Sequence, residues 1–212
     1  MREPDPEGPA RGVPVGHPVR ELQTARGASL NESTGTPTDR SVEGASPRVA
    51  KRIRLLTGTA ILVIGLDVAT KATVVAMLAG RRPVRLLGGL VYLVHTRNTG
   101  AAFSIAEGQT VLLSLVALAV VIAIARTARR LGSNAWAVCL GLILGGAVGN
   151  LADRIFRAPG PLRGAVVDWI DLRVWPVFNL ADSALVVGVC LAVLFEVQGR
   201  RIDGSRATKR RG

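Results

Sequence analysis

The feature that most constrains this chain is a series of four apolar segments, each near the length of a membrane-spanning helix. They cover residues 55–78, 109–125, 135–152 and 181–197 of the 212. A helix needs about 20 mostly apolar residues to cross the ~30 Å hydrocarbon core of a bilayer. Backbone polar groups cannot stay unpaired in lipid, so such segments cross as helices. The sequence therefore predicts an all-α integral membrane protein with four transmembrane helices.

The rest of the chain divides into a membrane domain and two tails. Residues 1–50 are rich in Pro, Gly, Ser, Thr, Arg and Glu without periodicity, which predicts a disordered tail. Residues 51–198 hold all four apolar segments and form the expected membrane domain. Residues 199–212 contain six basic residues and form a second expected tail. No apolar region with a cleavage site occurs near the N-terminus, so we expect no removable signal peptide.

The distribution of basic residues predicts the orientation of the helices. The formal net charge is +12, and the basic residues closest to helix ends precede the first segment, follow the second and follow the fourth. Positive residues at helix ends favour the cytoplasmic side of a membrane. We therefore expect both termini in the cytoplasm and the connections 80–108 and 153–180 outside. Aromatic residues make up only 4% of the chain, so we expect no nucleic-acid partner.

The first outer connection carries a strand signal. Residues 90–94 are Leu, Val, Tyr, Leu and Val, and they lie between Gly88-Gly89 and the turn-forming Asn98-Thr99-Gly100. This pattern predicts a short strand or two at the membrane face. The second outer connection is polar and contains three prolines, and we expect a loop there.

Cysteine and histidine residues do not indicate a metal site. Cys139 and Cys190 lie in apolar segments without a CxxC pattern or a nearby histidine, so we expect two small buried side chains and no disulfide. His17 and His95 are isolated in the sequence. We expect neither a metal nor another cofactor.

Polar residues that are costly to bury gather where the apolar segments meet the outer connections. An ionisable side chain at membrane depth costs about 2.5–3.5 kcal/mol and usually faces a bundle interior or a water-filled cavity. All of these residues should project to the extracytoplasmic end of the bundle, which makes that end the candidate site. They are Asp67, Lys71, Asn150, Asp153, Arg154, Asp168, Asp171, Asn179 and Asp182.

Asp67 and Lys71 stand four residues apart, on one face of the first predicted helix. Two interpretations are open. The residues can form a self-neutralising pair that lowers the cost of insertion, or they can support a functional site.

The tetrapeptide Asn-Leu-Ala-Asp occurs twice, at residues 150–153 and 179–182. On a helix, this spacing puts the amide and the carboxylate on one face. In the second copy, Asn179 can cap a helix whose first turn contains Asp182. The first copy lies at the C-terminal end of its helix, where the helix dipole disfavours a carboxylate. Capping therefore does not explain both copies.

Two carboxylates that meet in a partly dry site can share one proton. The ionised carboxylate then activates a water molecule while the protonated one polarises a carbonyl, which is the chemistry of aspartic peptidases. The spacing leaves open which members of the set pair: Asp153, Asp168, Asp171 and Asp182 are all candidates.

The competing function is a small ion- or proton-coupled transporter, because transporters also use intramembrane carboxylates. Two features argue against it. The acidic residues gather at one end and form no chain across the bundle, and the sequence shows no inverted repeat of broken helices.

Five short motifs, taken in order, resemble those of the bacterial lipoprotein signal peptidases, the type II signal peptidases. The resemblance covers roughly residues 60–195. A single Asp-x-x-x-Lys would mean little, but the ordered set on four membrane segments is specific. The motifs are Asp67 with Lys71, residues 98–104, residues 149–154, residues 166–169 and residues 178–183.

The resemblance implies an aspartic endopeptidase of the bacterial cell membrane, with its active site near the extracytoplasmic face. The substrate would be a diacylglyceryl-modified prolipoprotein, cut on the N-terminal side of the modified cysteine by a monomer surrounded by membrane lipid. The family fold adds a small outer β-cradle and a short surface helix between the third and fourth helices. The catalytic residues would be Asp168 and Asp182, and the substrate-binding or supporting residues would be Asp67, Lys71, Asn98, Gly100, Asn150, Asp153, Arg154 and Asn179.

Overall fold

A computed structural model describes residues 47–100 and 109–206. These residues belong to one compact unit of the chain, residues 42–212. The predicted disordered tail lies almost wholly outside the described residues. So do residues 101–104 of the second motif and residues 207–212 of the predicted C-terminal tail.

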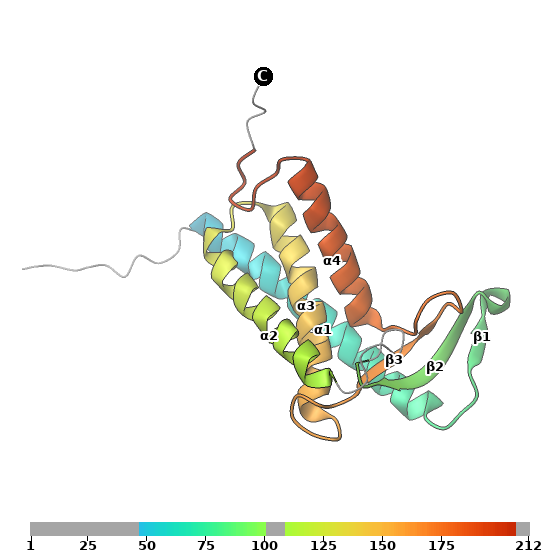
Figure 1. Cartoon of the computed structure of the whole chain (residues 1–212). Helices are drawn as coiled ribbons and strands as arrows, with labels where there is room; N and C mark the ends of the chain where they lie inside the picture. The colour runs from blue at the N-terminus through green and yellow to red at the C-terminus, as the bar shows by residue number, and fades with distance from the viewer. Residues whose placement is uncertain (1–46, 101–108, 207–212) are drawn as a thin grey trace, which may run out of the picture. The chain divides into compact units, whose positions relative to one another are not determined.

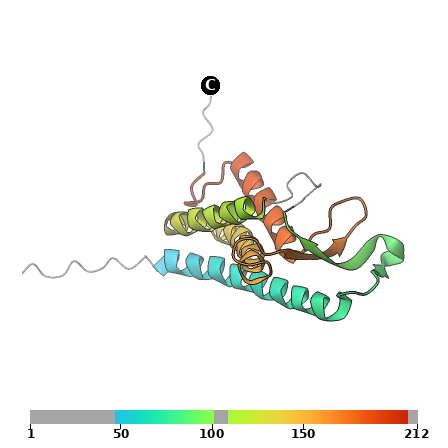
Figure 2. The ribbon, with the colours of Figure 1, turned by 60° about the horizontal axis from the view of Figure 1, so that its bottom comes forward.

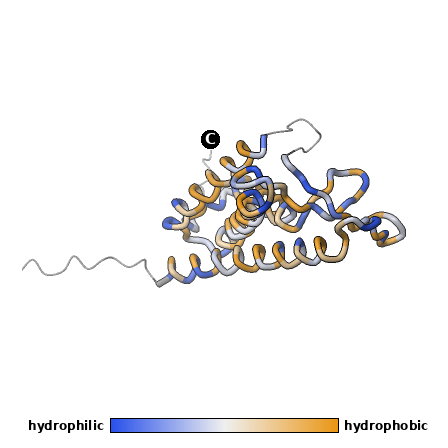
Figure 3. The backbone as a smooth tube through the Cα atoms, turned by 90° about the horizontal axis from the view of Figure 1, so that it is seen from below, coloured by the Kyte–Doolittle hydropathy of each residue, from blue (hydrophilic) through white to orange (hydrophobic). Residues whose placement is uncertain are grey.

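Four helices form the main body of this unit: α1 (Pro47–Leu78), α2 (Thr110–Thr127), α3 (Asn134–Phe156) and α4 (Leu180–Val197). Each is long and apolar enough to cross a membrane, which confirms the predicted fold class. Figure 3 shows hydrophobic residues along the helices and hydrophilic segments mainly at their ends and in the connections. α1 begins earlier than its apolar segment, because residues 47–54 include the good helix formers Arg, Ala and Lys.

α3 is the central helix. It contacts each of the other three helices (Figures 1 and 2). In its most apolar stretch of 18 residues, 61% of the residues are buried, against 11–22% in the other three helices. The outward faces of α1, α2 and α4 are therefore the ones left to face lipid.

Glycines on α3 let the neighbouring helices approach closely. A Cβ atom on Gly145 would lie 2.7 Å from the Cβ of Val63 and 2.9 Å from the carbonyl oxygen of Ala60, both on α1. On the other side of α3, a Cβ on Gly146 would lie 2.7 Å from the Cγ of Leu185 on α4. Small residues are a common means of helix packing in lipid.

A three-stranded antiparallel sheet lies at one end of the helices (Figure 1). Its strands are β1 (Val84–Leu86), β2 (Val91–Asn98) and β3 (Val166–Asp171), in that order, and the 3-10 turn η1 (Leu87–Gly89) joins β1 to β2. The strand signal around residues 90–94 is confirmed. The prediction of a loop around Asp168 and Asp171 was wrong. These residues pair with β2 and form β3.

The connection from α3 to β3 contains turns and, among its described residues, no surface helix, so this expectation from the family was wrong. Pro159, Gly160 and Pro161 interrupt any helix there. The backbone N–H of Gly164 donates to the carbonyl of Arg154 at 3.0 Å. The connection thus folds back onto the end of α3 and starts β3 beside it.

The two cysteines lie in different surroundings. Cys139 on α3 is buried, and its Sγ lies 3.1 Å from the carbonyl oxygen of Gly188 on α4. Cys190 is exposed on α4, so the expectation of a buried side chain was wrong there. An apolar segment that crosses a membrane has an outward face, and its hydrophobicity alone does not tell which residues that face carries.

Residues 199–206 form a short hairpin after α4, closed by a β-bridge between Arg200 and Arg206. Two hydrogen bonds fasten this hairpin to the connection between α2 and α3 and to the first turn of α3. The N–H of Gly132 donates to the carbonyl of Ile202 at 2.8 Å, and the indole N–H of Trp136 donates to the carbonyl of Arg200 at 2.9 Å. The first part of the predicted C-terminal tail is therefore packed against the helices.

Candidate active site

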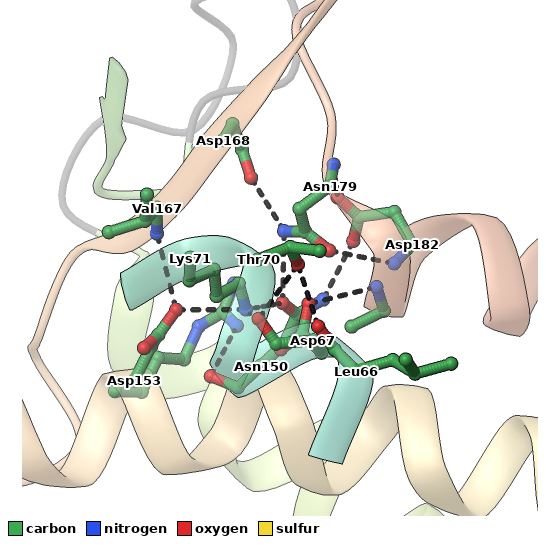
Figure 4. Close-up of polar contacts among 12 residues, drawn as sticks. Leu66, Asp67, Thr70, Lys71, Asn150, Asp153, Val167, Asp168, Asn179 and Asp182 are labelled. Carbon is green, nitrogen blue, oxygen red and sulfur yellow. Dashed lines mark hydrogen bonds and ion pairs between the residues drawn. The ribbon is translucent and has the colours of Figure 1, made fainter. Parts of the chain in front are cut away.

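Polar side chains from five elements meet at the end of the bundle where the sheet lies, and Figure 4 shows those from α1, α3, β3 and the start of α4. They come from α1, β2, α3, β3 and the start of α4. The structure brings together the residues that the family motifs indicated: Asp67, Lys71, Asn98, Asn150, Asp153, Arg154, Asp168, Asn179 and Asp182.

Lys71 connects α1 to α3. Its side chain is only 1% exposed, and its ammonium lies 2.7 Å from Oδ2 of Asp67, 2.9 Å from Oδ2 of Asp153 and 3.1 Å from Oδ1 of Asn150. The ammonium therefore forms ion pairs with two carboxylates and donates a hydrogen bond to an amide oxygen. The predicted pair with Asp67 is present, and Lys71 also reaches two residues of the first Asn-Leu-Ala-Asp copy.

Asp67 and Asp153 both contact other elements besides Lys71. Oδ1 of Asp67 accepts a hydrogen bond of 3.1 Å from the backbone N–H of Ala181 and so reaches α4. Besides Lys71, Asp153 accepts from Nε of Arg157 at 2.5 Å and from the backbone N–H of Val167 at 3.2 Å. These two carboxylates hold α1, α3, β3 and α4 together.

Asp168 occupies a different environment. Its side chain is buried, and its two oxygens accept hydrogen bonds from Nδ2 of Asn98 at 2.8 Å and from Nδ2 of Asn179 at 2.6 Å. Burial raises the pKa of Asp168 to about 6. The hydrogen bond from Asn98 opposes this rise, and the negative charge of Asp182 adds to it. This side chain therefore holds a proton more readily than an ordinary aspartate.

The sheet positions Asn98 beside Asp168. On the antiparallel pair β2–β3, Thr96 is opposite Asp168 and Asn98 is opposite Val166, so Asn98 and Asp168 are diagonal neighbours on one face. Oδ1 of Asn98 accepts from the N–H of Gly100 at 2.8 Å, which turns the amide nitrogen toward Asp168. Gly100 has a φ of 122°, a conformation that favours glycine.

The chain turns back after β3 and brings Asn179 to Asp168. The N–H of Phe178 donates to the carbonyl of Ile170 at 3.0 Å, and the N–H of Trp169 donates to the carbonyl of Phe178 at 2.9 Å. The residue that follows Phe178 is therefore placed next to the strand, which explains the short contact between Asn179 and Asp168.

Asn179 and Asp182 form a capping box at the start of α4. Oδ1 of Asn179 accepts from the N–H of Asp182 at 2.9 Å, and Oδ2 of Asp182 accepts from the N–H of Asn179 at 3.1 Å. The predicted cap is confirmed. It leaves the other oxygen of Asp182, Oδ1, to accept from Nδ2 of Asn150 at 2.7 Å. Capping and participation in the site are therefore compatible.

Two asparagines link Asp168 to Asp182. Nδ2 of Asn179 donates to Asp168 and also to Oδ1 of Asn150 at 3.1 Å, while Nδ2 of Asn150 donates to Asp182. Figure 4 shows these side chains converging from β3, α3 and α4. Amide groups thus hold the two carboxylates without neutralising either one.

Arg154 supplies positive charge to the same region. Its Nη1 donates to the carbonyl of Asn150 at 3.2 Å, and its charge interacts with those of Asp182, Asp168 and Asp153. The guanidinium therefore offsets the negative charge of several carboxylates. Its buried Nε–H donates to no described residue.

Asp171 is separated from the site. It lies three residues beyond Asp168 on a strand, where an odd spacing places side chains on opposite faces. Oδ1 of Asp171 accepts from the backbone N–H of Arg173 at 2.8 Å, and Oδ2 lies 3.4 Å from the Nε of Arg173. The hydrogen bond and the ion pair of the Asp171 carboxylate are thus with Arg173 and not with the residues of the site.

Sequence reasoning missed Arg157, which forms an ion pair with Asp153. The signal was present, since the two residues stand four apart at the end of a helix. The backbone donors of Val167 and Ala181 were also missed, and no residue-type signal could have revealed them, because any residue offers the same N–H.

The family model for signal peptidase (SPase) II matches residues 59–198. The lipoprotein signal peptidase of Mycobacterium tuberculosis is 47% identical over 161 residues, which cover 76% of this chain and 80% of the relative. The lipoprotein signal peptidase of Rhodococcus jostii is 49% identical over 160 residues, which cover 76% and 81%.

A solved bacterial membrane enzyme has a similar fold. The two structures superpose with a TM-score of 0.58 at 24% sequence identity, and the match covers 77% of this chain and 94% of the other. A second solved bacterial membrane enzyme gives a TM-score of 0.57 at 25% identity. The arrangement of four helices and a small sheet is therefore one that a known membrane enzyme also adopts.

Proposed function

Because the chain belongs to the signal peptidase II family, we propose that Asp168 and Asp182 are its two catalytic carboxylates. The protein is a membrane-spanning hydrolase, a peptidase of lipoprotein precursors. The observation that supports the assignment is the bridge of two asparagine amides between these carboxylates, while Lys71 engages the other acidic pair of the site.

The proposed chemistry needs one protonated and one ionised carboxylate. The ionised carboxylate takes a proton from water, and the protonated one donates to the oxygen of the scissile carbonyl as the tetrahedral intermediate forms. Collapse of that intermediate breaks the C–N bond, and the leaving amine takes up a proton. Burial raises the pKa of Asp168, which favours Asp168 as the carboxylate that starts with the proton.

The neighbouring residues have positioning roles in this proposal. Asn98 and Asn179 fix the orientation of the Asp168 carboxyl, and Asn150 fixes that of Asp182. Arg154 offsets the negative charge around the pair. Geometry of this kind matters because a misplacement of about 1 Å can cost about a hundredfold in rate.

The proposed substrate is a diacylglyceryl-modified prolipoprotein, cleaved on the N-terminal side of the modified cysteine. The relatives are named lipoprotein signal peptidases, which supports this substrate class. The site lies at one end of the membrane-spanning helices, where a peptide segment that leaves a bilayer would pass. A monomer embedded in membrane lipid contains every residue that the proposal uses.

We also propose the orientation that the basic residues favour. Arginines gather at the end of the bundle opposite the site, which supports a cytoplasmic location for both termini and an extracytoplasmic active site in the bacterial cell membrane. The family match gives no support to the competing transporter function.

The test is processing of a diacylglyceryl prolipoprotein by the purified protein in detergent or lipid, followed as a gel shift. Asp168→Asn and Asp182→Asn should each reduce the cleavage rate by about 10²–10⁴-fold, because each removes one member of the acid–base pair. Asp171→Asn is the matched control and should keep more than half of the activity.

The variants must remain folded and inserted, which circular dichroism and membrane fractionation can check. Full activity in either Asp168→Asn or Asp182→Asn would reassign the catalytic pair, with Asp153 as the next candidate. Equal loss in Asp171→Asn and Asp168→Asn would contradict the separation of these two residues across the strand.

A further inference from the structure

The end of the bundle opposite the active site carries two adjoining cavities. The first, of about 620 Å³, is lined by residues of α2, of the 3-10 turn η2 (Ala128–Arg130) that follows it, of α4 and of the C-terminal hairpin. The second, of about 640 Å³, is lined by residues of α2 and η2 alone. Both cavities include Arg126 and Arg130, so the two arginines stand between them.

The hairpin brings a further arginine to the first cavity. Arg201 lines it together with Asp203, and the backbone bonds of the neighbouring Ile202 and Arg200 to Gly132 and Trp136 fix the hairpin in place. Because a Cβ atom on Gly132 would collide with the backbone of Asp203, the contact between hairpin and helix connection is close. Arg201 is therefore held by a folded structure.

Positive charge exceeds negative charge around the two cavities. Their linings contain four arginines (Arg126, Arg129, Arg130 and Arg201) and two carboxylates. One of these carboxylates, Asp203, is occupied within the hairpin, where its Oδ1 accepts from the N–H of Ser205 at 2.8 Å. Arg126, Arg129 and Arg130 form no ion pair with any residue that the structure describes. The dipole of α2 favours positive charge at its end, but it does not pair these guanidinium groups.

The second cavity is lined by apolar residues as well as by these arginines. Ile122 and Ala125 line it about one helical turn from Arg126 and Arg129, and both are exposed on the outward face of α2. A free phosphate ion would contact only the guanidinium groups. A phospholipid would also lay its acyl chains along Ile122 and Ala125, on a helix that crosses the membrane.

We propose that this surface, formed by Arg126, Arg129, Arg130 and Arg201, binds the phosphate headgroup of an anionic phospholipid. The guanidinium groups supply charge and paired N–H donors for phosphate oxygens. The outward face of α2 receives the acyl chains. The site lies apart from the catalytic carboxylates, and it gives the protein a lipid-binding function beyond proteolysis. It acts as an anchor that holds the ends of α2 and α4 at the membrane surface.

Native mass spectrometry of the full chain in detergent, titrated with phosphatidylglycerol, tests the proposal. The variant Arg126→Gln/Arg130→Gln should bind phosphatidylglycerol roughly tenfold more weakly than the wild type, because basic residues near a membrane surface each strengthen the attraction to anionic lipid. Arg201→Gln should weaken binding by a smaller factor, about threefold. Phosphatidylcholine, which has no net charge, should bind equally weakly to all forms.

The matched control is Arg81→Gln/Arg82→Gln. It removes two exposed arginines just beyond α1, outside both cavities. This control should keep wild-type affinity for phosphatidylglycerol. Equal weakening in both double variants would show that net charge alone causes the effect, and would overturn the proposal. Unchanged binding in Arg126→Gln/Arg130→Gln would also overturn it. Displacement of the lipid by an equal concentration of inorganic phosphate would identify a free anion as the ligand and also overturn it. Unchanged peptidase activity and circular dichroism in detergent would show that the variants are folded.

Discussion

At the scale of single residues, the site contains two kinds of carboxylate. Asp67 and Asp153 share the ammonium of Lys71 and take part in the contacts that join the helices. Asp168 and Asp182 accept hydrogen bonds from amide side chains, which orient a carboxylate without supplying a full positive charge. The first pair is suited to hold the structure together, and the second is suited to exchange protons.

The variant Lys71→Met tests the first pair. It leaves two buried carboxylates without their shared cation, and loss of one partner from a buried ion pair typically costs about 3–5 kcal/mol. We expect the midpoint of thermal unfolding in detergent to fall markedly. Lys51→Met is the control, since Lys51 is exposed near the start of α1 and its loss should change the free energy of unfolding by less than about 0.5 kcal/mol. Similar midpoints for the two variants would contradict the connecting role of Lys71.

The raised pKa of Asp168 predicts how stability depends on pH. From about pH 4 to pH 6 the folded protein holds a proton at Asp168 that the unfolded chain has lost, so this residue's contribution to stability falls as pH rises. We expect the wild type to lose on the order of 3 kcal/mol relative to Asp168→Asn across this range, because a pKa of about 6 lies roughly two units above the ordinary value. Thermal unfolding of both proteins from pH 4 to pH 8 measures the difference.

Asp203→Asn is the control for this measurement. Asp203 is exposed, and hydrogen bonds from Ser205 hold its pKa below the ordinary value. Its contribution is therefore lost only below about pH 4, and over the tested range the variant should follow the wild type. A wild type that gains stability relative to Asp168→Asn as pH rises would show that burial does not favour the protonated form of Asp168.

At the scale of the elements, the small residues of α3 decide how closely α1 can pack. Gly145→Leu would push the new side chain into Val63 and the backbone of Ala60. Overpacking costs about 1–3 kcal/mol, and the displacement of α1 would also draw Lys71 away from α3. We expect a lower midpoint of thermal unfolding and at least a tenfold loss of peptidase activity. Gly65→Leu is the control, because a Cβ atom there meets open space on α1. Equal effects in both variants would rule out close packing as the cause.

The helices were predictable from the sequence and β3 was not, for physical reasons. A membrane-spanning helix satisfies its own backbone, so apolar length alone identifies it. The strand β3 has only six residues, two of them aspartates, and its hydrogen bonds go to β2, about 70 residues away in the chain. No local sequence pattern predicts that pairing of β3 with β2. The cap of α4 was predictable because Asn179 and Asp182 lie within one turn.

The proposed pairing of Asp168 with Asp182 could not be read from spacing. It depends on the reversal that aligns Phe178 with Ile170, and this reversal is a backbone contact. The motifs of the family indicated the pair, while residue chemistry alone left four carboxylates open. The docking of the hairpin 199–206 was not predictable for a similar reason. It depends on backbone carbonyls of the hairpin that accept from the N–H of Gly132 and the indole N–H of Trp136, and on the close approach that Gly132 permits.

At the scale of the whole described unit, the two ends of the helix bundle differ in chemistry. One end carries the sheet and the other the hairpin (Figure 1). Carboxylates and amides are concentrated at the sheet end, and Arg126, Arg129, Arg130 and Arg201 line the two cavities at the hairpin end. The uneven distribution of basic residues in the sequence indicated this polarity. The first of the two cavities could not be predicted from the sequence, because it depends on where the hairpin docks.

The position of Asn179 and Asp182 on the last helix has a consequence for the protein during its synthesis. A ribosome delivers the chain from its N-terminus, so Asp67, Lys71 and Asn150 enter the bilayer before the segment that completes the proposed catalytic pair. An unfinished chain holds the supporting residues but lacks one of the two proposed catalytic carboxylates. Proteolysis by the proposed pair can therefore begin only after α4 has been synthesised and has joined the other helices in the membrane.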